Sequence, residues 1–239
     1  MGEQINMQCN ICGSSEFFDM RSRKQVRCAG CNSLERTRLI ALMIEKYIPI
    51  NRNTKILHIA PEPTLALHFH SIAGDNCTFV DLEPERFKHI PQMKRLDLCS
   101  DLPLIESNSY DIIIHSHVLE HLPCNYTYVL FHLHRIMTES AKMICSIPFL
   151  PGYFDGCTDP ALSRKERLRR FGQRDHITCF GVDDLQMSLG KVYDLPANYD
   201  ARDYIESDTL IKHNVPETIW TGYSPHSVLI LGKNDYKLA

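Results

Sequence analysis

Apolar and polar positions follow two different periods along most of this chain, and together they predict an α/β fold. Between residues 54 and 150, short apolar runs typical of buried strands are separated by stretches in which apolar residues recur every three or four positions, as in helices. Strands are predicted over residues 55–60, 77–82, 93–98, 110–116 and 142–148. Helices are predicted over residues 64–73 and 126–137. This order favours a doubly wound, mostly parallel sheet.

The two ends of the chain depart from this alternation. Ser33 is placed to cap a helix whose apolar stripe runs from Leu39 to Tyr47. Two late strands, which would bring the sheet to seven, are predicted over residues 191–195 and 227–233. We therefore expect three parts: residues 1–33 as a small module, residues 34–53 as a connecting helix, and residues 54–239 as the α/β domain, with a lid or acceptor-binding segment around 151–190.

Four cysteines near the N-terminus form the most specific motif of the chain. They make two C-x2-C pairs separated by fifteen residues: Cys9, Cys12, Cys28 and Cys31. This spacing is typical of a tetrahedral zinc site, and Gly13 and Gly30 allow the backbone to turn around the metal. Four thiolates leave no open coordination position, so we expect a structural zinc ion that supplies the folding energy of this zinc ribbon.

The composition limits the classes of protein to which the chain could belong. Its 239 residues suffice for one ordinary domain and a small attachment. A formal net charge of -3 does not favour a general nucleic-acid binder, and no apolar run is long enough to cross a membrane. The first residues contain no apolar signal core, so we expect a reducing cytoplasm. There, six further cysteines would be small hydrophobic residues or surface thiols: Cys77, Cys99, Cys124, Cys145, Cys157 and Cys179.

Four segments of the predicted α/β domain resemble class I S-adenosylmethionine (SAM)-dependent methyltransferases. They are ILHIAPE, FVDLEP, LDLCSDLP and SYDIIIHSHVLEHLP, all between residues 54 and 150. The last segment, an Asp-led apolar strand followed by V-L-E-H-L-P, is typical of the small-molecule branch of that family. The whole chain also resembles a bacterial subgroup with an N-terminal zinc ribbon, through CNSLER, LHIAPE and RRFGQRDH. The resemblance implies a Rossmann-like sheet and SAM as cofactor.

The resemblance also assigns cofactor contacts to residues that follow the predicted strands, where open parallel sheets bind their ligands. The residues implied are Ala60, Glu62, Asp81, Leu82, Asp97, Leu98 and Ser116. Asp81, or Glu83 in its place, would bind the two ribose hydroxyls. Asp97 would accept a hydrogen bond from the adenine amino group, with the backbone of Leu98 close to the ring. The alternative for both aspartates is a carboxylate that only closes a turn.

The loop after the first strand of the α/β domain departs from the family pattern. Methyltransferases of this class carry a Gly-rich turn here, whereas this chain has Ala60, Glu62 and Thr64 with prolines between them. Proline has no N–H to donate and fixes φ, so the loop offers fewer donors to a cofactor. Glu62 would compensate by pairing with the α-ammonium group of SAM. His58 stands where the family often has an acid.

Histidine is the predicted general base. Methyl transfer to oxygen or nitrogen requires removal of a proton, and imidazole suits this task because it titrates near neutral pH. Three candidates follow the strand over 110–116 or lie on the predicted lid: His117, His121 and His176. His115 lies within that strand and is as readily a core residue. The set His117, Glu120 and His121 also resembles the E-x-x-E-H motif of ubiquinone-pathway O-methyltransferases, which implies a second, divalent metal beside the acceptor.

Two basic stretches bear on the substrate. One surrounds the ribbon: Arg21, Arg23, Lys24, Arg27, Arg36 and Arg38. The other lies on the predicted lid: Arg164, Lys165, Arg167, Arg169, Arg170 and Arg174. Most charge runs are solvated faces, but the second run would suit an anionic acceptor such as a sugar or sugar phosphate.

The leading hypothesis is therefore O-methylation of a small, anionic molecule. One alternative is RNA methylation, with the ribbon binding the nucleic acid, although aromatic residues are not interleaved with the basic stretches as stacking requires. The other alternative is a scaffold protein that keeps the fold without catalysis.

Overall fold

A six-stranded sheet forms the centre of the molecule in the computed structural model, which describes residues 6–238. The first five residues of the predicted zinc ribbon, and residue 239, lie outside the described residues. In spatial order the strands are β11 (Val228–Gly232), β7 (Met137–Ser146), β6 (Tyr110–Ser116), β3 (Ile56–Ile59), β4 (Cys77–Asp81) and β5 (Lys94–Arg95). Only the pairing of β11 with β7 is antiparallel in this sheet. The prediction of a mostly parallel, Rossmann-like sheet is confirmed.

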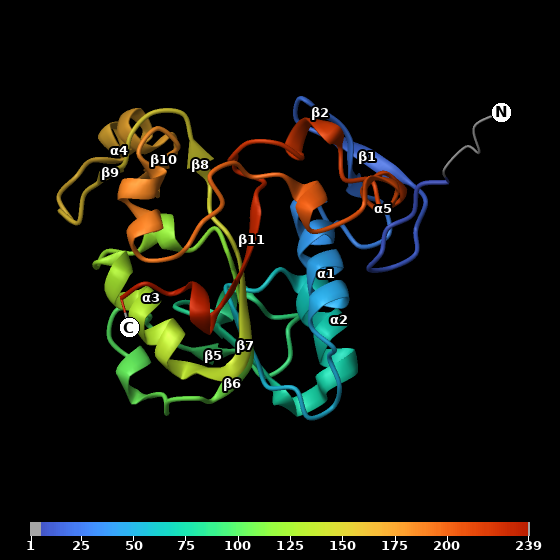
Figure 1. Ribbon diagram of the computed structural model, residues 1–239, viewed down its shortest axis with the longest axis horizontal. Coiled ribbons are helices and arrows are strands. Elements are labelled where there is room, and N and C mark those ends of the chain that lie inside the picture. The colour runs from blue at the N-terminus through green and yellow to red at the C-terminus, as the bar shows by residue number, and fades with distance from the viewer. Residues whose placement is uncertain (1–5, 239) are drawn as a thin grey trace.

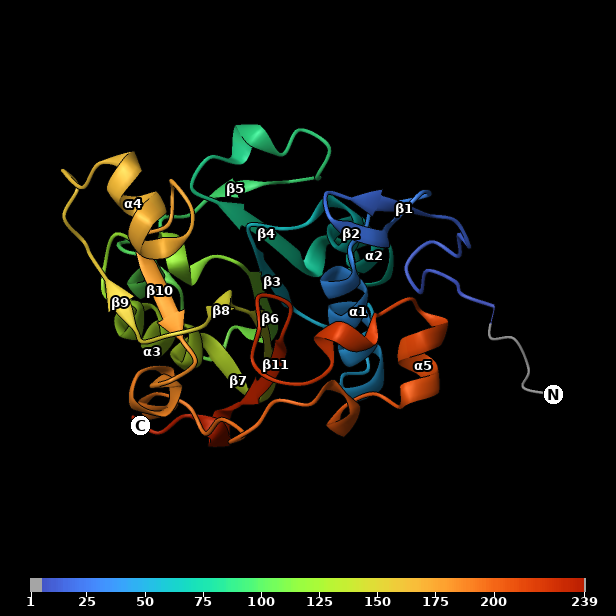
Figure 2. The same ribbon diagram turned by 90° about the horizontal axis from the view of Figure 1, so that it is seen from above.

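Helices cover both faces of this sheet (Figure 2). On one face lie α1 (Glu35–Tyr47) and α2 (Pro63–Ala73), and on the other lies α3 (Tyr126–Ile136). Most of the apolar stripes predicted for α1 and α3 are buried in the core: Leu39, Ile40, Met43, Ile44, Val129, Leu130, Leu133 and Ile136. Tyr47, at the end of the α1 stripe, is exposed instead. The start of α3 is capped by Asn125, whose side chain accepts a hydrogen bond from the amide of Thr127.

The prediction of a seventh strand over residues 191–195 is wrong. This segment follows a 3-10 turn over Leu189–Lys191, and the amide of Tyr193 donates to the carbonyl of Leu189 at 3.0 Å. The segment also pairs with residues 235–237 in an isolated bridge, because the amide of Asp194 donates to the carbonyl of Asp235 at 2.6 Å, and it does not join the central sheet. The apolar pattern has another cause, because Tyr193 is buried in the core and its ring packs against that of Tyr236.

The strand predicted over residues 93–98 is shorter than expected, because β5 has only two residues. The carboxylate of Asp97 accepts a hydrogen bond from the amide of Cys99 at 2.9 Å, and the amide of Asp101 donates to the carbonyl of Asp97 at 2.8 Å. A side chain that bonds its own backbone in this way competes with strand pairing and ends the strand.

The zinc ribbon is a hairpin of β1 (Phe17–Met20) and β2 (Arg23–Cys28) that lies between the two cysteine pairs. It lies beside α5 (Ser207–Lys212), which comes from the far end of the chain (Figure 1). Arg38 of α1 is fully buried and donates hydrogen bonds to four backbone carbonyls: those of Val26, Ser33, His213 and Asn214. This one side chain therefore joins the ribbon to the C-terminal part of the chain.

Ser33 does not cap α1, so that prediction is wrong. The N-cap residue is Leu34, which makes no side-chain capping bond. The hydroxyl of Ser33 lies instead 3.4 Å from the sulfur of Cys9 and 3.2 Å from that of Cys31. The cysteine cluster competes successfully for the hydroxyl that the sequence pattern assigned to the helix.

The predicted lid forms a small layer of its own. Three short strands pair in the order β8 (Phe149–Leu150), β10 (Thr178–Gly181) and β9 (Asp155–Gly156), and α4 (Arg164–Phe171) packs against β10. Phe171, Ile177 and Cys179 form a separate apolar cluster beneath it. The lid layer and the zinc ribbon lie at the same end of the molecule, on opposite sides (Figure 1).

One prediction about the cysteines is wrong. Cys99 and Cys124 form a disulfide instead of remaining free thiols. Cys99 follows β5 and Cys124 follows the V-L-E-H-L-P segment, and folding brings their Cα atoms to 5.8 Å, which is within the range for a disulfide. Cys77, Cys145 and Cys179 are buried, as expected of small hydrophobic residues. Within residues 6–238, no helix is long and apolar enough to cross a membrane.

Candidate active site

The predicted cofactor residues follow neighbouring strands and lie along the carboxyl edge of the sheet. Ile59 pairs with Val80 of β4 and with His115 of β6, so the residues that follow these strands are neighbours. The turn after β3 bends at Ala60, whose φ of 46° is in the left-handed region that favours glycine. The amide of Ala60 donates to the carbonyl of Val80 at 2.8 Å. The chain therefore makes the tight turn of the Gly-rich loop without a glycine.

Each of the two predicted carboxylates uses one oxygen to close a turn. Oδ1 of Asp81 accepts from the amide of Glu83 at 2.8 Å, and Oδ1 of Asp97 accepts from the amide of Cys99 at 2.9 Å. Within the described part of the chain, the Oδ2 atoms of both residues make no hydrogen bond. The turn-forming alternative is thus observed, while one oxygen of each remains available. The ribose and adenine roles stay predictions.

Four further residues of the predicted cofactor site differ in how well they suit a cofactor. Glu83, the substitute for Asp81, is exposed and pairs with Arg86 at 3.1 Å. Leu82 is exposed, whereas Leu98 is buried. The hydroxyl of Ser116, at the end of β6, is buried and lacks a hydrogen-bond partner within residues 6–238.

Glu62 lies at the start of α2 and faces two basic groups. Its carboxylate is 3.5 Å from Nε2 of His58 and 3.9 Å from Nη2 of Arg36. Burial opposes ionisation of Glu62, but His58 and Arg36 outweigh it and hold the pKa of the carboxyl below its usual value. Glu62 is therefore an anion with buried carboxylate oxygens beside the turn at Ala60. Its predicted pairing with the ammonium group of SAM stays a prediction.

His117 is held by contacts at both of its ring nitrogens. Its backbone has a φ of 55°, and Nε2 lies 2.9 Å from the carbonyl oxygen of Pro225 and 3.1 Å from Nη1 of Arg36. Burial, and secondarily the charge of Arg36, lower the pKa of His117 to about 3. A histidine that is held in this way is a poor general base at neutral pH.

Glu120 lies at the centre of a cluster of histidines. It is fully buried, and neither of its carboxylate oxygens makes a hydrogen bond within the described residues. Oε1 lies 3.9 Å from Nε2 of both His121 and His176, and 3.5 Å from Nδ1 of His117. Burial raises the pKa of Glu120 to about 8, and burial lowers the pKa of His176 to about 4. At neutral pH the acid is therefore mostly protonated and His176 is neutral.

The structure assembles a metal-binding set that differs from the predicted one. The ligand atoms of Glu120, His121 and His176 lie within 4.8 Å of one another. The rings of His121 and His176 meet edge to face, with centroids 4.7 Å apart. His176 comes from the segment before β10 and replaces His117, which was predicted as the third ligand. Sequence spacing could not find this set because fifty-five positions separate its last two members.

The four ribbon cysteines fit a zinc ion. Their sulfur atoms lie within 4.8 Å of one another, with 3.7 Å between Cys9 and Cys31 and 3.5 Å between Cys12 and Cys28. Tetrahedral zinc with Zn–S bonds of about 2.3 Å requires sulfur atoms about 3.8 Å apart. A Cβ atom at Gly30 would lie 3.0 Å from the sulfur of Cys12, so this turn has no room for a side chain.

Most of the ribbon's basic residues have partners within the protein. Arg23 pairs with Glu35, Lys24 pairs with Asp19 at 2.7 Å, and Arg27 donates to Asn32. Arg38 donates to four backbone carbonyls, whereas the nearest acid to Arg36 is Glu62, at 3.9 Å. Four of the six basic residues of this stretch therefore have hydrogen-bonded partners within the protein.

The lid's basic run is also partly neutralised. Arg169 pairs with Glu166, and Arg170 pairs with Asp155. Sequence analysis missed Asp155 because it lies on β9, fifteen positions away from its partner. The remaining cations, which form no ion pair within residues 6–238, are Arg164, Lys165, Arg167 and Arg174.

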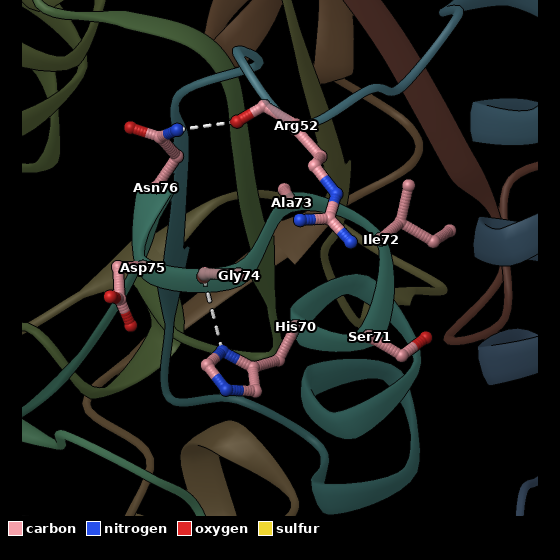
Figure 3. A pocket seen from close by; sticks show the side chains of 8 residues that line it. All are labelled: Arg52, His70, Ser71, Ile72, Ala73, Gly74, Asp75 and Asn76. Carbon is pink, nitrogen blue, oxygen red and sulfur yellow. Dashed lines mark hydrogen bonds between the residues drawn. The ribbon is translucent and has the colours of Figure 1, made fainter.

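A separate surface hollow lies at the other end of α2, away from the carboxyl edge of the sheet (Figure 3). It is lined by Arg52 and by residues 70–76. Two of its polar groups bond to backbone carbonyls: Asn76 donates to the carbonyl of Arg52 at 2.5 Å, and Nδ1 of His70 donates to the carbonyl of Gly74 at 3.1 Å. The guanidinium of Arg52 also lines the hollow.

No family model and no curated protein matches the chain. Among solved structures, a SAM-dependent methyltransferase from Mesorhizobium loti matches with a TM-score of 0.52 and 10% identity, covering 84% of this chain and 98% of that one. A SAM-dependent methyltransferase from Archaeoglobus fulgidus has a TM-score of 0.49 and 17% identity, covering 82% and 93%. The chain has the fold of a class I SAM-dependent methyltransferase. In open α/β sheets generally, ligands bind at the carboxyl edge of the strands.

Proposed function

We propose that this protein is a SAM-dependent methyltransferase that methylates a hydroxyl group of a small, anionic acceptor. The observation that carries the proposal is the position of two groups of residues at one edge of a methyltransferase sheet. Ala60 follows β3, and Asp81 and Ser116 are the last residues of β4 and β6; all three would face SAM. The Glu120 cluster lies directly beyond β6, on the side toward the lid. A cofactor and an acid–base group are thus adjacent, as methyl transfer requires.

His121 has the best geometry for the general base. Its Nδ1 atom donates to the carbonyl of Asp175 at 3.2 Å, so Nε2, which lies 3.9 Å from Glu120, is the nitrogen left to accept a proton. Its side chain is 37% exposed, whereas that of His176 is nearly buried. An acceptor hydroxyl can reach His121 from solvent, so His176 and Glu120 would orient it.

The same three side chains could instead hold a divalent metal, as two histidines and one carboxylate do in facial triads. Binding a cation would favour ionisation of Glu120, whose pKa is raised to about 8 by burial. Titration with Co²⁺ after the ribbon is filled with zinc tests this. Co²⁺ bound to the Glu120 cluster should give a visible spectrum without thiolate bands, and His176→Ala should remove this spectrum. If the zinc-filled wild type binds no Co²⁺, a metal at the Glu120 cluster is excluded.

The lid supports an anionic acceptor. Arg164, Lys165 and Arg174 are exposed on or beside α4 and form no ion pair within the described residues. Arginine and lysine bind phosphate and carboxylate groups well. A sugar phosphate or nucleotide-linked sugar therefore fits better than a neutral acceptor, and RNA fits less well because the ribbon's cations already have partners.

The decisive experiment is to incubate the purified protein with methyl-labelled SAM and fractionated cell extracts. We expect label in the small-metabolite fraction, retained on an anion exchanger. Label in RNA would favour the alternative acceptor. If calorimetry detects SAM binding but no fraction becomes labelled, methyl transfer to a small molecule is wrong, and if it detects no binding the scaffold alternative stands.

A further inference from the structure

The ion pair between Arg36 and Glu62 lies where the strand order of the sheet reverses. From β3 the chain proceeds to β4 on one side, and β6 lies on the other side of β3. Glu62 follows β3, and His117, which contacts Arg36, follows β6. Open α/β sheets bind ligands at this reversal. The pair therefore occupies the position at which a ligand is expected.

The two side chains are not satisfied by each other. Nη2 of Arg36 and Oε1 of Glu62 are 3.9 Å apart, which is too long for a hydrogen bond. Nε of Arg36 and both oxygens of Glu62 are buried and make no hydrogen bond within residues 6–238. Buried charged groups without hydrogen bonds destabilise a protein, so this arrangement points to a ligand that supplies the missing partners.

The contact between Arg36 and His117 is also incomplete. Nε2 of His117 lies 3.1 Å from Nη1 of Arg36 and 2.9 Å from the carbonyl oxygen of Pro225. One imidazole nitrogen cannot accept a hydrogen bond from the guanidinium and also donate one to the carbonyl. Either the guanidinium or the carbonyl therefore lacks a partner, and an anion that binds Arg36 would relieve the conflict.

We propose that Arg36 and Glu62 form the subsite for the zwitterionic α-amino acid end of the cofactor. Arg36 binds the carboxylate and Glu62 binds the ammonium group. A half-buried cation beside a half-buried anion complements a zwitterion, whose opposite charges are also adjacent, and the planar guanidinium matches a carboxylate. The assignment rests on the proposed function, because it presumes that SAM binds at this edge.

The zinc ribbon helps to position this subsite. Arg36 lies in the first turn of α1, directly after the ribbon, and the preceding residue, Glu35, is buried and pairs with Arg23 of β2. The hydroxyl of Thr64, in the first turn of α2, donates to the carbonyl of Cys31 at 2.6 Å. The helices that carry Arg36 and Glu62 are thus each tied to the ribbon. The ribbon therefore contributes to the cofactor site itself.

The test compares two ligands that differ only at the amino acid end. S-adenosylhomocysteine carries the zwitterion, whereas 5′-methylthioadenosine has the same adenosine and thioether without it. Calorimetry would measure both with the wild type, Arg36→Ala, Arg36→Lys and Arg21→Ala, the last being a control in the exposed turn of the hairpin.

We expect Arg36→Ala to weaken the binding of S-adenosylhomocysteine by about 10- to 100-fold, the range for a lost hydrogen bond to a charged group. The affinity for 5′-methylthioadenosine should not change. Arg36→Lys should lose less affinity for S-adenosylhomocysteine, and Arg21→Ala should bind it as tightly as the wild type. Unchanged binding of S-adenosylhomocysteine, or equal weakening of both ligands, would overturn the assignment.

Two outcomes with the wild type separate this inference from the proposed function. If the wild type binds both ligands equally well, the zwitterion subsite is wrong while cofactor binding stands. If it binds neither ligand, the proposed function itself fails. Should Arg36→Ala not fold, the wild type and Arg36→Lys still decide the question, because a decarboxylated analogue of S-adenosylhomocysteine should bind both proteins with similar affinity.

Discussion

The zinc ribbon and the Glu120 cluster are both groups of potential metal ligands, but they differ in almost every physical respect. The ribbon has four sulfur atoms at nearly tetrahedral separations, supplied by two short turns. The Glu120 cluster has one carboxylate and two imidazoles at 3.9 Å, supplied by a turn after β6 and by the lid. Closed sets of four thiolates stabilise a fold, whereas incomplete sets with one exposed member leave room for chemistry. On this comparison we propose that the first region serves stability and the second serves the reaction.

Loss of a zinc ligand should give the largest effect. Cys28→Ser removes one of four thiolates, and structural zinc supplies roughly 10 kcal/mol or more to small modules. We expect the variant to lose its zinc and to unfold at a much lower temperature, measured by metal analysis and by thermal denaturation. Cys157→Ser, at a half-buried lid position, is the control and should keep one zinc per chain. A wild type that contains no zinc under metal-replete conditions would contradict the assignment.

Removal of the base should give the next largest effect. His121→Ala is expected to lower kcat by about 10²- to 10⁴-fold on the true acceptor, because proton removal contributes that much to catalysis. The affinity for S-adenosylhomocysteine should not change. His89→Ala, at an exposed position, should retain full turnover. Wild-type turnover in His121→Ala, with loss in His176→Ala, would transfer the role to the buried histidine.

Loss of a predicted cofactor contact should give a smaller effect than loss of the base. Asp81→Ala should weaken the binding of SAM by about 1.5–3 kcal/mol, the range for hydrogen bonds to a charged group. Its Oδ2 atom is available, whereas Glu83 is already paired with Arg86. Calorimetry on Asp81→Ala and Glu83→Ala would separate the two carboxylates. If the wild type and Asp81→Ala bind SAM equally well, Asp81 does not contact the ribose and only closes the turn with Glu83.

The smallest effect concerns stability and pH. The pKa of Glu120 is raised to about 8, so the folded state keeps a proton that the unfolded state releases above its ordinary pKa. The free energy of unfolding should therefore fall as pH rises from about 5 to 8, by up to about 1.4 kcal/mol per pH unit. Chemical denaturation of Glu120→Gln should show a flatter profile than the wild type. Glu139→Gln, at an exposed position, should reproduce the wild-type slope.

Sequence patterns predicted the elements that depend on local periodicity. The Ile-rich run of β6 coincides with the predicted range, and α3 begins at the predicted residue behind Asn125. The patterns failed where a side chain had a competing partner. Ser33 contacts the cysteines instead of capping α1, and Asp97 ends β5 after two residues. The sequence shows which groups are present, but not which of them bond.

In the candidate site, too, local features were predictable from the sequence and contacts between distant residues were not. The spacing of Cys9, Cys12, Cys28 and Cys31 determined the ribbon ligands, because two short turns fix their geometry locally. The strand ends determined where Ala60, Asp81 and Ser116 would lie. Only the tertiary structure gathered His176 with Glu120, joined Cys99 to Cys124, and placed Arg36 beside Glu62. These pairs are distant in sequence and meet only when separate elements pack together, so no local periodicity records them.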